Sequence, residues 1–208
     1  MNGKRRILVT GAASGIGAAL AARLAVAGDS VIGLDRTGSD LTCDLADPAA
    51  IAATVEGIAG PLTGIAHVAG LPGTADSAII MAVNCEAPRL LTAALAPRLV
   101  PGASVVAVAS VTAARCPLDD AAKDRWLALP ASEWSVPADG KIAYEYSKAL
   151  LIRWVQQAAA DFRAQGVRIN AVSPGPVETP ILADFAASIG ADRIAAAAAL
   201  TGRHARAP

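Results

Sequence analysis

The chain has 208 residues, 54% of them hydrophobic, and its 18 basic and 18 acidic residues leave no formal net charge. This is long enough for one domain with a well-packed core. Without a basic patch or polybasic segment, nucleic acid and anionic membranes are not expected as partners. Apolar runs such as Ile194–Leu200 are too short to span a bilayer, and Met1–Arg6 has no apolar signal-peptide core. The scattered cysteines Cys43, Cys85 and Cys116 fit neither a disulfide framework nor a metal site, so we expect a soluble cytoplasmic protein without bound metal.

Short β-branched segments alternate with alanine-rich segments, which is the pattern of βαβ units on a parallel sheet. The predicted strands are Arg5–Thr10, Ser30–Asp35, Leu41–Cys43, Gly64–Ala69, Ser104–Ala109 and Val167–Val172. The predicted helices are Ile16–Ala27, Pro48–Ile58, Met81–Leu99 with a bend near Pro88, and Ile142–Gln165. With no linker that would divide it, residues 1–208 are expected to form one α/β domain.

Two connections are irregular. Arg36–Asp40 is too short for a helical crossover between parallel strands, so the third strand is expected to be vestigial. The segment 111–141 is a long insertion with several prolines and two tryptophans, Trp126 and Trp134. Long connections are usually functional or disordered, and the aromatic residues favour a packed segment.

A glycine-rich turn, Thr10–Gly17, lies where the first predicted strand meets the first helix. The free N–H groups and partial positive charge of a helix N-terminus suit a pyrophosphate, and glycine lets the backbone approach it closely. A tight turn alone would be a weak signal. Its place in the chain and the following acidic residue favour a dinucleotide site in a Rossmann-type fold.

That acidic residue is Asp35, at the end of the second strand, near the spacing expected for a carboxylate that binds the adenosine ribose. A carboxylate there would repel a 2′-phosphate, since like charges about 4 Å apart cost on the order of 4 kcal/mol near a protein surface. Arg36 could instead pair with that phosphate. Because Asp35 comes directly at the strand end, we favour NAD over NADP.

Tyr144 and Lys148 are four residues apart on the long predicted helix, so their side chains can converge on one point. A free tyrosine has a pKa of about 10, and lowering it to about 7 requires roughly 4 kcal/mol of differential stabilisation. A nearby ammonium group supplies such stabilisation directly. The pair alone is weak evidence, since this spacing is common on solvated helix faces.

Taken together, these motifs resemble the short-chain dehydrogenase/reductase family over about residues 7–179. Thr10–Gly17 matches the family's TGxxxGIG motif in every fixed position, and Asp44–Leu45 corresponds to its acidic-aliphatic pair beside adenine. The Asn-Asn-Ala-Gly motif of the family matches only at Ala69–Gly70, and His67 stands in an asparagine position. We interpret His67 as a hydrogen-bonded structural residue.

The resemblance implies the catalytic residues Asn84, Ser110, Tyr144 and Lys148. Tyr146 does not fit the YxxxK motif because Leu150 stands where the lysine would be. Tyr144 would exchange the proton of the substrate, and Lys148 would lower the Tyr144 pKa and bind the nicotinamide ribose. Ser110 would hold the substrate oxygen, and Asn84 would position a water that links Lys148 to solvent.

A PG turn at Pro174–Thr179 completes the match, with Val177 and Thr179 expected at the nicotinamide carboxamide. The implied NAD site consists of Gly11, Ser14, Gly15, Ile16, Gly17, Asp35, Arg36, Asp44, Leu45, Ala69, Gly70, Tyr144, Lys148, Pro174, Val177 and Thr179.

Within the family, the short second crossover and the long segment before the Tyr144 helix resemble bacterial 3-alpha-hydroxysteroid dehydrogenase/carbonyl reductases. The expected reaction is therefore the interconversion of a secondary alcohol and a ketone on a hydrophobic cyclic substrate. In the substrate-side segment 176–200, Leu182, Phe185 and Ile189 recur at helical spacing and suit such a substrate, although plain helix packing explains them equally well.

The resemblance also implies a further helix and a last strand beyond the PG turn, whereas this chain stops at Pro208. The predicted sheet therefore lacks these elements, and the strand Val167–Val172 becomes an exposed edge, covered by another chain or left open by a truncation. The family implies a homodimer, and the segment 111–141 could block its usual helix-to-helix contact. A dinucleotide-binding sensor with little catalysis is the alternative function, which would not need the four catalytic residues together.

Overall fold

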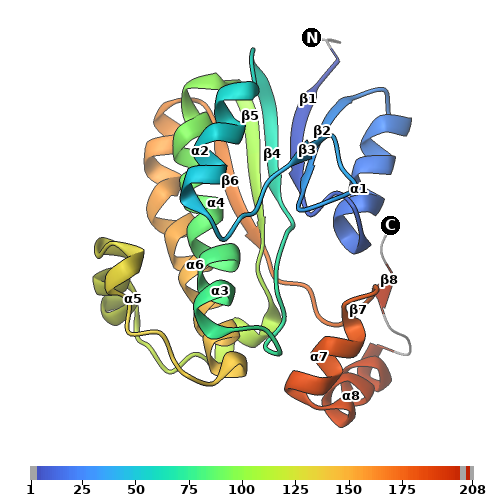
Figure 1. The fold of residues 1–208 in the computed structure, drawn as a ribbon, viewed down its shortest axis with the longest axis vertical. Coiled ribbons are helices and arrows are strands. Elements are labelled where there is room, and N and C mark those ends of the chain that lie inside the picture. The colour runs from blue at the N-terminus through green and yellow to red at the C-terminus, as the bar shows by residue number, and fades with distance from the viewer. Residues whose placement is uncertain (1–3, 202–204, 207–208) are drawn as a thin grey trace.

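A computed structural model describes residues 4–201 and 205–206, and its main feature is a six-stranded parallel sheet (Figure 1). The strand order is β3-β2-β1-β4-β5-β6, which confirms the expected Rossmann-type doubly wound sheet. The strands are β1 Arg6–Thr10, β2 Ser30–Asp35, β3 Leu41–Thr42, β4 Leu62–His67, β5 Leu99–Val108 and β6 Arg168–Val172. The two-residue β3 is as short as predicted. A separate pair joins β7 (Val177–Glu178) to β8 (Ala205–Arg206).

Helices lie on both faces of the sheet, with α2, α4 and α6 together on one side and α1 on the other (Figure 1). Their bounds are α1 Gly15–Val26, α2 Pro48–Gly57, α3 Ser77–Met81, α4 Ala87–Leu95, α5 Asp120–Ala128, α6 Gly140–Ala164, α7 Leu182–Ile189 and α8 Ala191–Thr201. The short 3-10 and π segments are η1 Ala82–Glu86, η2 Ala96–Arg98, η3 Val111–Arg115 and η4 Ala131–Glu133.

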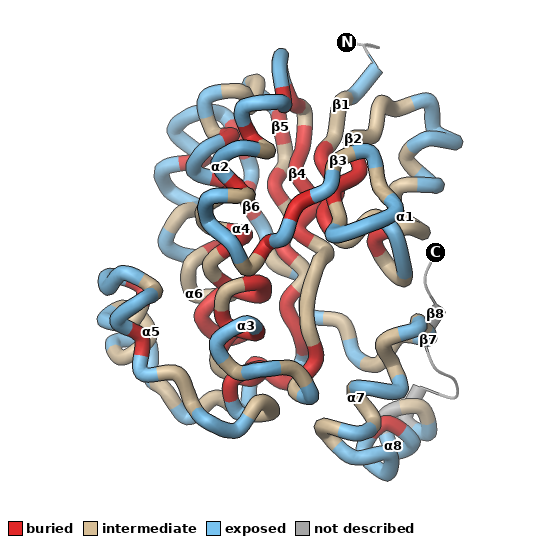
Figure 2. Tube along the Cα trace, viewed as in Figure 1, coloured by how far each residue is buried: buried red, intermediate tan, exposed pale blue. Residues whose placement is uncertain are grey.

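The main core lies between the sheet and the helices of the first face, where buried residues concentrate along β4, β5 and the inner sides of α4 and α6 (Figure 2). Leu8, Ile65 and Val105 come from the strands, and Leu91 and Leu151 come from the helices that cover them. The stretch Ser77–Arg98 is long and apolar enough to cross a membrane, but 56% of its most apolar window is buried here. It therefore serves as a core helix of this domain.

The helix predicted at Met81–Leu99 begins earlier, at Ser77, and widens to π geometry at Ala82–Glu86, just before Pro88. Pro88 has no N–H to donate to the carbonyl of Asn84, so the α-helical hydrogen-bond ladder cannot continue there. Such π segments are frequent at functional sites, and this one contains Asn84. The expected bend is thus a local change of helix type.

Two other elements differ from their predicted bounds. β5 begins at Leu99 rather than Ser104, with a register shift in its pairing between Leu62 and Gly64 of β4. The substrate-side segment forms two helices, α7 and α8, because Gly190 has a φ of 99° and ends the first of them.

The segment 111–141 is folded against the outer sides of α4 and α6. The rings of Trp126 and Trp134 lie 6.1 Å apart, and Trp134 packs in a cluster with Met81 and Leu150. Arg89 of α4 lies 5.7 Å from the centre of the Trp134 ring and donates a hydrogen bond to the Leu127 carbonyl at 2.9 Å. These contacts hold the segment 111–141 against Arg89 of α4 and against the buried cluster beside it.

β6 is the edge strand of the sheet, next to β5 alone. Ile169 is buried against α6, whereas Arg168, Asn170 and Val172 are exposed, and Val172 is 48% accessible to solvent. The edge position expected for this strand is therefore present in the described part of the chain.

His67, at the end of β4, is a buried polar residue. Its Nε2 lies 2.7 Å from the Thr92 hydroxyl, and its Nδ1 has no hydrogen-bond partner among the described residues. Burial lowers the pKa of His67 from 6.5 to about 3, so the ring is neutral in the folded protein. The buried, neutral ring agrees with a structural role for His67. Its low pKa also makes the folded state less able to take up a proton than the unfolded state.

Because the folded-state pKa of His67 lies below the unfolded value, the associated stability is present above about pH 6.5 and is lost as the pH falls towards 3. The variant His67→Gln keeps a group that can bond Thr92 but cannot titrate. Between about pH 7 and about pH 5, the wild type should lose about 2 kcal/mol more unfolding free energy than this variant. Urea unfolding of both proteins measures this, and equal losses would show that His67 does not carry the pH dependence.

Candidate active site

A cavity of about 480 Å³ lies at the carboxyl ends of the strands, where the strand order reverses between β1 and β4. Dinucleotides bind at this switch point in open α/β sheets. Every residue predicted to bind the cofactor lines the cavity, as do Ser110, Tyr144 and Lys148. The cavity thus collects motifs that are spread from residue 11 to residue 179.

The glycine turn fits the pyrophosphate of a dinucleotide. A Cβ added at Gly17 would overlap the carbonyl of Gly11, so only glycine permits this close turn. Ser14 precedes α1 without a side-chain hydrogen bond that caps the helix, which leaves its first N–H groups to a ligand. A Cβ added at Gly15 would lie 3.3 Å from the Thr179 methyl group, so the segment after the PG turn packs directly on the glycine turn.

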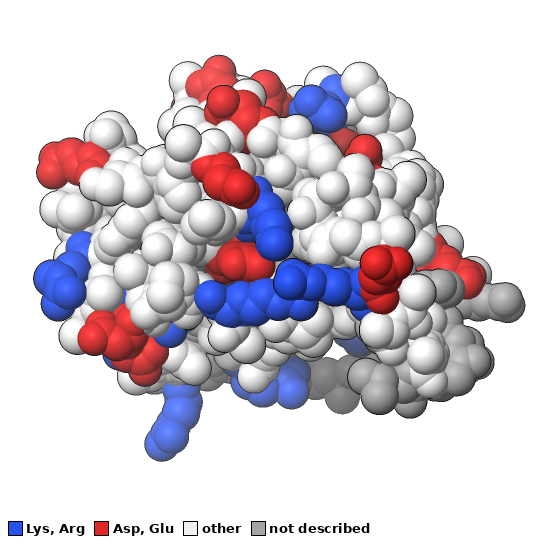
Figure 3. Space-filling view, turned by 90° about the horizontal axis from the view of Figure 1, so that it is seen from below, with Lys and Arg blue, Asp and Glu red and all other residues white. Residues whose placement is uncertain are grey.

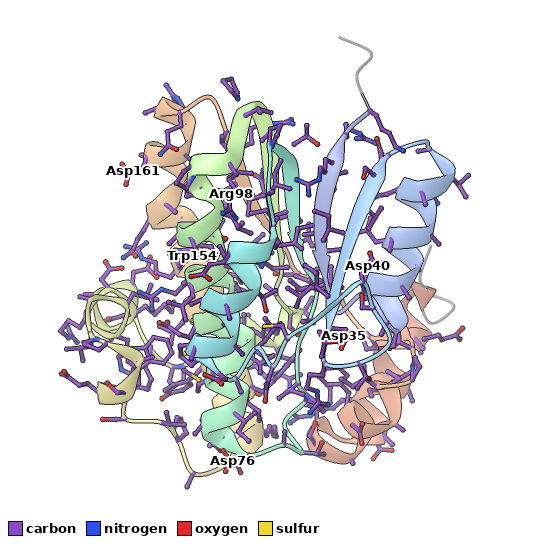
Figure 4. The ribbon with its side chains drawn as sticks, turned by 45° about the horizontal axis from the view of Figure 1, so that its top comes forward. Asp35, Asp40, Asp76, Arg98, Trp154 and Asp161 are labelled. Carbon is purple, nitrogen blue, oxygen red and sulfur yellow. The ribbon has the colours of Figure 1, made fainter. Side chains whose placement is uncertain are left out.

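Asp35 lies at the carboxyl end of β2, where Figure 4 shows it near the loop that carries Asp40. Its Oδ2 accepts a hydrogen bond from the Ala13 N–H at 3.0 Å, and its Oδ1 accepts one from the Arg36 N–H at 2.7 Å. The carboxylate is therefore fixed beside the glycine turn. This position suits a hydroxyl-bearing ribose, and the negative charge disfavours a phosphate in the same place.

Ser110 and Tyr144 approach each other from different elements. Ser110 follows β5 and caps η3, where its Oγ accepts a hydrogen bond from the Thr112 N–H at 3.2 Å. Tyr144 lies in the second turn of α6, 5% exposed, and its ring contacts Phe185 of α7 at 5.3 Å between centres. A hydrogen bond with Ser110 tends to lower the Tyr144 pKa. The two hydroxyl groups therefore meet at one point of the cavity wall.

Lys148 lies one turn beyond Tyr144 on α6 and is buried. Its ammonium donates a hydrogen bond to the Val108 carbonyl at 2.8 Å and lies 5.9 Å from the centre of the Tyr144 ring. Burial lowers the pKa of Lys148 to about 8. A proton on this lysine is therefore held less firmly than on a surface lysine.

Burial also raises the pKa of Tyr144 above its ordinary value, and this outweighs the hydrogen bond with Ser110. Lys148 is not among the groups that lower this pKa in the cofactor-free protein, so its effect on the Tyr144 pKa stays a prediction. The physical reason is that both side chains are desolvated, while the Lys148 ammonium is engaged with the Val108 carbonyl. The free protein therefore keeps a neutral phenol.

Asn84 does not line the cavity, unlike the other three catalytic candidates. Its Oδ1 accepts a hydrogen bond from the Leu71 N–H at 2.8 Å, and its Nδ2 donates to the Leu71 carbonyl at 3.0 Å and to the Ser147 hydroxyl at 3.2 Å. A Cβ added at Gly70 would lie 3.2 Å from Asn84 Oδ1 and 3.4 Å from Lys148 Nζ. Asn84 therefore tethers the wall after β4 to α6, directly behind Lys148.

Several lining residues were not found by sequence reasoning. Ile79 and Val83, from α3 and η1, add apolar surface, and Arg115 and Arg193 add two cations. No motif marks them, because their place in the cavity depends on how α3, η1, η3 and α8 pack around the strand ends. Leu182, Phe185 and Ile189 were predicted from helical spacing and do line the cavity.

Comparison with known proteins agrees with these motifs. The model of the short chain dehydrogenase family matches residues 5–119, and the model described as enoyl-(acyl carrier protein) reductase matches residues 127–207. A coniferyl-alcohol dehydrogenase from a Pseudomonas species is 37% identical over 202 residues, covering 91% of this chain and 79% of that protein. The 3-alpha-hydroxysteroid dehydrogenase/carbonyl reductase of Comamonas testosteroni is 31% identical over 194 residues, covering 85% and 74%.

Among solved structures, a 3-alpha-hydroxysteroid dehydrogenase from a Pseudomonas species, complexed with NADH, superimposes with a TM-score of 0.79. It is 33% identical, and the match covers 97% of this chain and 84% of that chain. A short chain dehydrogenase from Burkholderia cenocepacia in complex with NADP is 26% identical, with a TM-score of 0.73 and coverage of 98% and 85%. The chain belongs to the short-chain dehydrogenase/reductase family and is an NAD(P)-dependent oxidoreductase that acts on CH–OH groups.

Proposed function

We propose that this dehydrogenase uses NAD to interconvert a secondary alcohol and a ketone on a hydrophobic cyclic substrate such as a hydroxysteroid. The observation that carries the proposal is the convergence of Ser110, Tyr144 and Lys148 on one cavity, with apolar side chains lining the part beside them. The alternative of a non-catalytic sensor does not require a serine and a tyrosine hydroxyl at the same point of the wall.

Each of the three residues has a distinct part in the proposed mechanism. Ser110 holds the substrate oxygen and stabilises the negative charge that develops on it. During oxidation the phenolate oxygen of Tyr144 takes up the proton of the substrate hydroxyl, and during reduction the phenol donates that proton back to the substrate oxygen. Lys148 stabilises the phenolate of Tyr144 and binds the nicotinamide ribose, and the bound nicotinamide supplies the hydride chemistry. We assign Asn84 a supporting part, since its amide holds Leu71 and Ser147 in place behind Lys148.

The apolar lining supports a hydrophobic cyclic substrate. Phe185 packs on the Tyr144 ring, and the lining beside it comes from α3, η1, α7 and α8, namely Ile79, Val83, Leu182, Ile189 and Ile194. Two relatives that are at least 30% identical are named for coniferyl alcohol and for a hydroxysteroid, which are both ring-containing alcohols.

A first prediction concerns the proton carrier. Tyr144→Phe keeps the ring against Phe185 but removes the hydroxyl, so kcat should fall by about 10²–10⁴-fold while NADH binding changes little. The matched control is Tyr146→Phe, because Tyr146 packs on Trp126 at 5.7 Å and does not line the cavity. Steady-state kinetics with hydroxysteroids and aromatic alcohols, together with NADH fluorescence titration, measures both effects. Turnover of the Tyr144 variant close to that of the control would remove Tyr144 from the mechanism.

A second prediction concerns the choice of cofactor. The negative charge of Asp35 should make kcat/KM with NAD at least about 100-fold higher than with NADP, given about 4 kcal/mol of repulsion at close range. In Asp35→Ala this preference should shrink at least about tenfold, chiefly through better use of NADP. Adding Arg36→Ala to that variant should reduce the use of NADP again. If Asp35→Ala left the cofactor preference unchanged, Asp35 would not be the residue that distinguishes the ribose of NAD from that of NADP.

A further inference from the structure

We infer that the cavity selects alcohols that carry a carboxylate or sulfonate group remote from the reacting hydroxyl, and that Arg115 and Arg193 bind this anion. The inference rests on the proposed function, since it names a feature of the substrate used at the same site. It concerns two residues that no sequence motif marks and that the proposed proton transfer does not use.

The chain places Arg115 at the other end of a short helix from Ser110. It is the last residue of η3, and that short helix begins directly after Ser110, which caps it. The side chain is 42% exposed and lines the cavity. When the oxygen of a substrate is hydrogen-bonded to Ser110, the Arg115 guanidinium is therefore separated from that oxygen by about the length of this short helix.

Glu145 explains why Arg115 stays at the cavity. Its side chain is only 10% exposed, and its Oε1 accepts no hydrogen bond from the described residues. The Arg115 guanidinium lies 3.7 Å away, which is beyond hydrogen-bond distance but close enough for strong attraction. A buried carboxylate needs a cation nearby, whereas the N–H donors of the guanidinium remain available to a second anion. Glu145 is thus a positioning residue for Arg115.

Arg193 is an exposed residue that reaches the same cavity from another element, α8. It lies in the first turn of α8, next to the buried Ile194, and lines the same cavity. Within the described part of the chain, Arg193 forms no ion pair. Figure 3 looks onto this end of the molecule and shows Lys and Arg side chains in a row across the middle of the face.

Glu145, which faces Arg115, does not line the cavity itself. Asp35 and Asp44, the acidic side chains among the described lining residues, belong to the adenosine end of the cavity. The substrate end therefore combines an apolar wall with two cations. A neutral steroid would offer no acceptor to the available N–H donors of Arg115 or to Arg193, whereas an amphipathic acid would fill the apolar part and pair with them.

The experiment compares acids with their methyl esters, which keep the shape and lose the charge. The pairs are lithocholic acid and methyl lithocholate, and 4-(1-hydroxyethyl)benzoate and its methyl ester, which are all secondary alcohols, each with NAD. We expect kcat/KM for an acid to exceed that for its ester at least about tenfold, mainly through KM, and to fall as salt is added. Arg115→Gln should lower kcat/KM for the acid by about 10–100-fold and change the ester less than about threefold.

Three further variants test whether the acid-to-ester ratio of kcat/KM depends on the two cavity arginines themselves. Arg125→Gln changes an exposed arginine of α5 outside the cavity and should leave the acid-to-ester ratio unchanged. Glu145→Gln should reduce the ratio, because Arg115 loses its anchor, whereas a purely structural defect would slow acid and ester alike. Arg193→Gln should also reduce the ratio without weakening NADH binding. Weaker NADH binding with an unchanged ratio would instead assign Arg193 to the cofactor phosphates.

The two proposals fail in different ways. Esters turned over as well as acids, with a ratio that Arg115→Gln does not change, would overturn the anion site and leave the dehydrogenase intact. NADH binding without turnover of any acid, ester or neutral hydroxysteroid would overturn the proposed function itself.

Discussion

Desolvation of Tyr144 and Lys148 is the physical constraint on which the site depends. Burial disfavours the charged form of each group, so it raises the pKa of the phenol and lowers the pKa of the ammonium to about 8. The cofactor-free protein therefore holds a neutral phenol beside an ammonium that is bonded to the Val108 carbonyl. For Tyr144 to accept a proton, its pKa must fall when a positively charged nicotinamide enters the cavity.

The fold creates this constraint by bringing distant segments to the carboxyl ends of the parallel strands. β5 delivers Val108 and Ser110, α6 delivers the tyrosine and lysine, and α7 closes the apolar side with Phe185. The π segment before α4 places Asn84 where its amide ties the wall after β4 to α6. The Val108 carbonyl on one side and the wall held by Asn84 on the other thus fix the position of Lys148.

Sequence reasoning predicted most of the elements because hydrophobic period, glycine turns and helix ends are local signals. It also predicted those lining residues of the cavity that belong to motifs, since the motifs occur at fixed places in a βαβ chain. It could not predict the direction of the Tyr144 pKa shift, which depends on how deeply α6 is buried. The π geometry around Asn84 and the inward place of Arg115 are likewise consequences of packing between distant segments.

The most direct test of the central claim is a pH titration of the protein labelled with ¹³C at the tyrosine Cζ, followed by NMR. The chain has two tyrosines, so a Tyr144→Phe spectrum assigns both signals. The account predicts that Tyr144 titrates above its ordinary pKa of about 10 in the free protein and moves markedly lower when NAD is bound. A Tyr144 signal that titrates at its ordinary value in both states, like an exposed tyrosine, would contradict it.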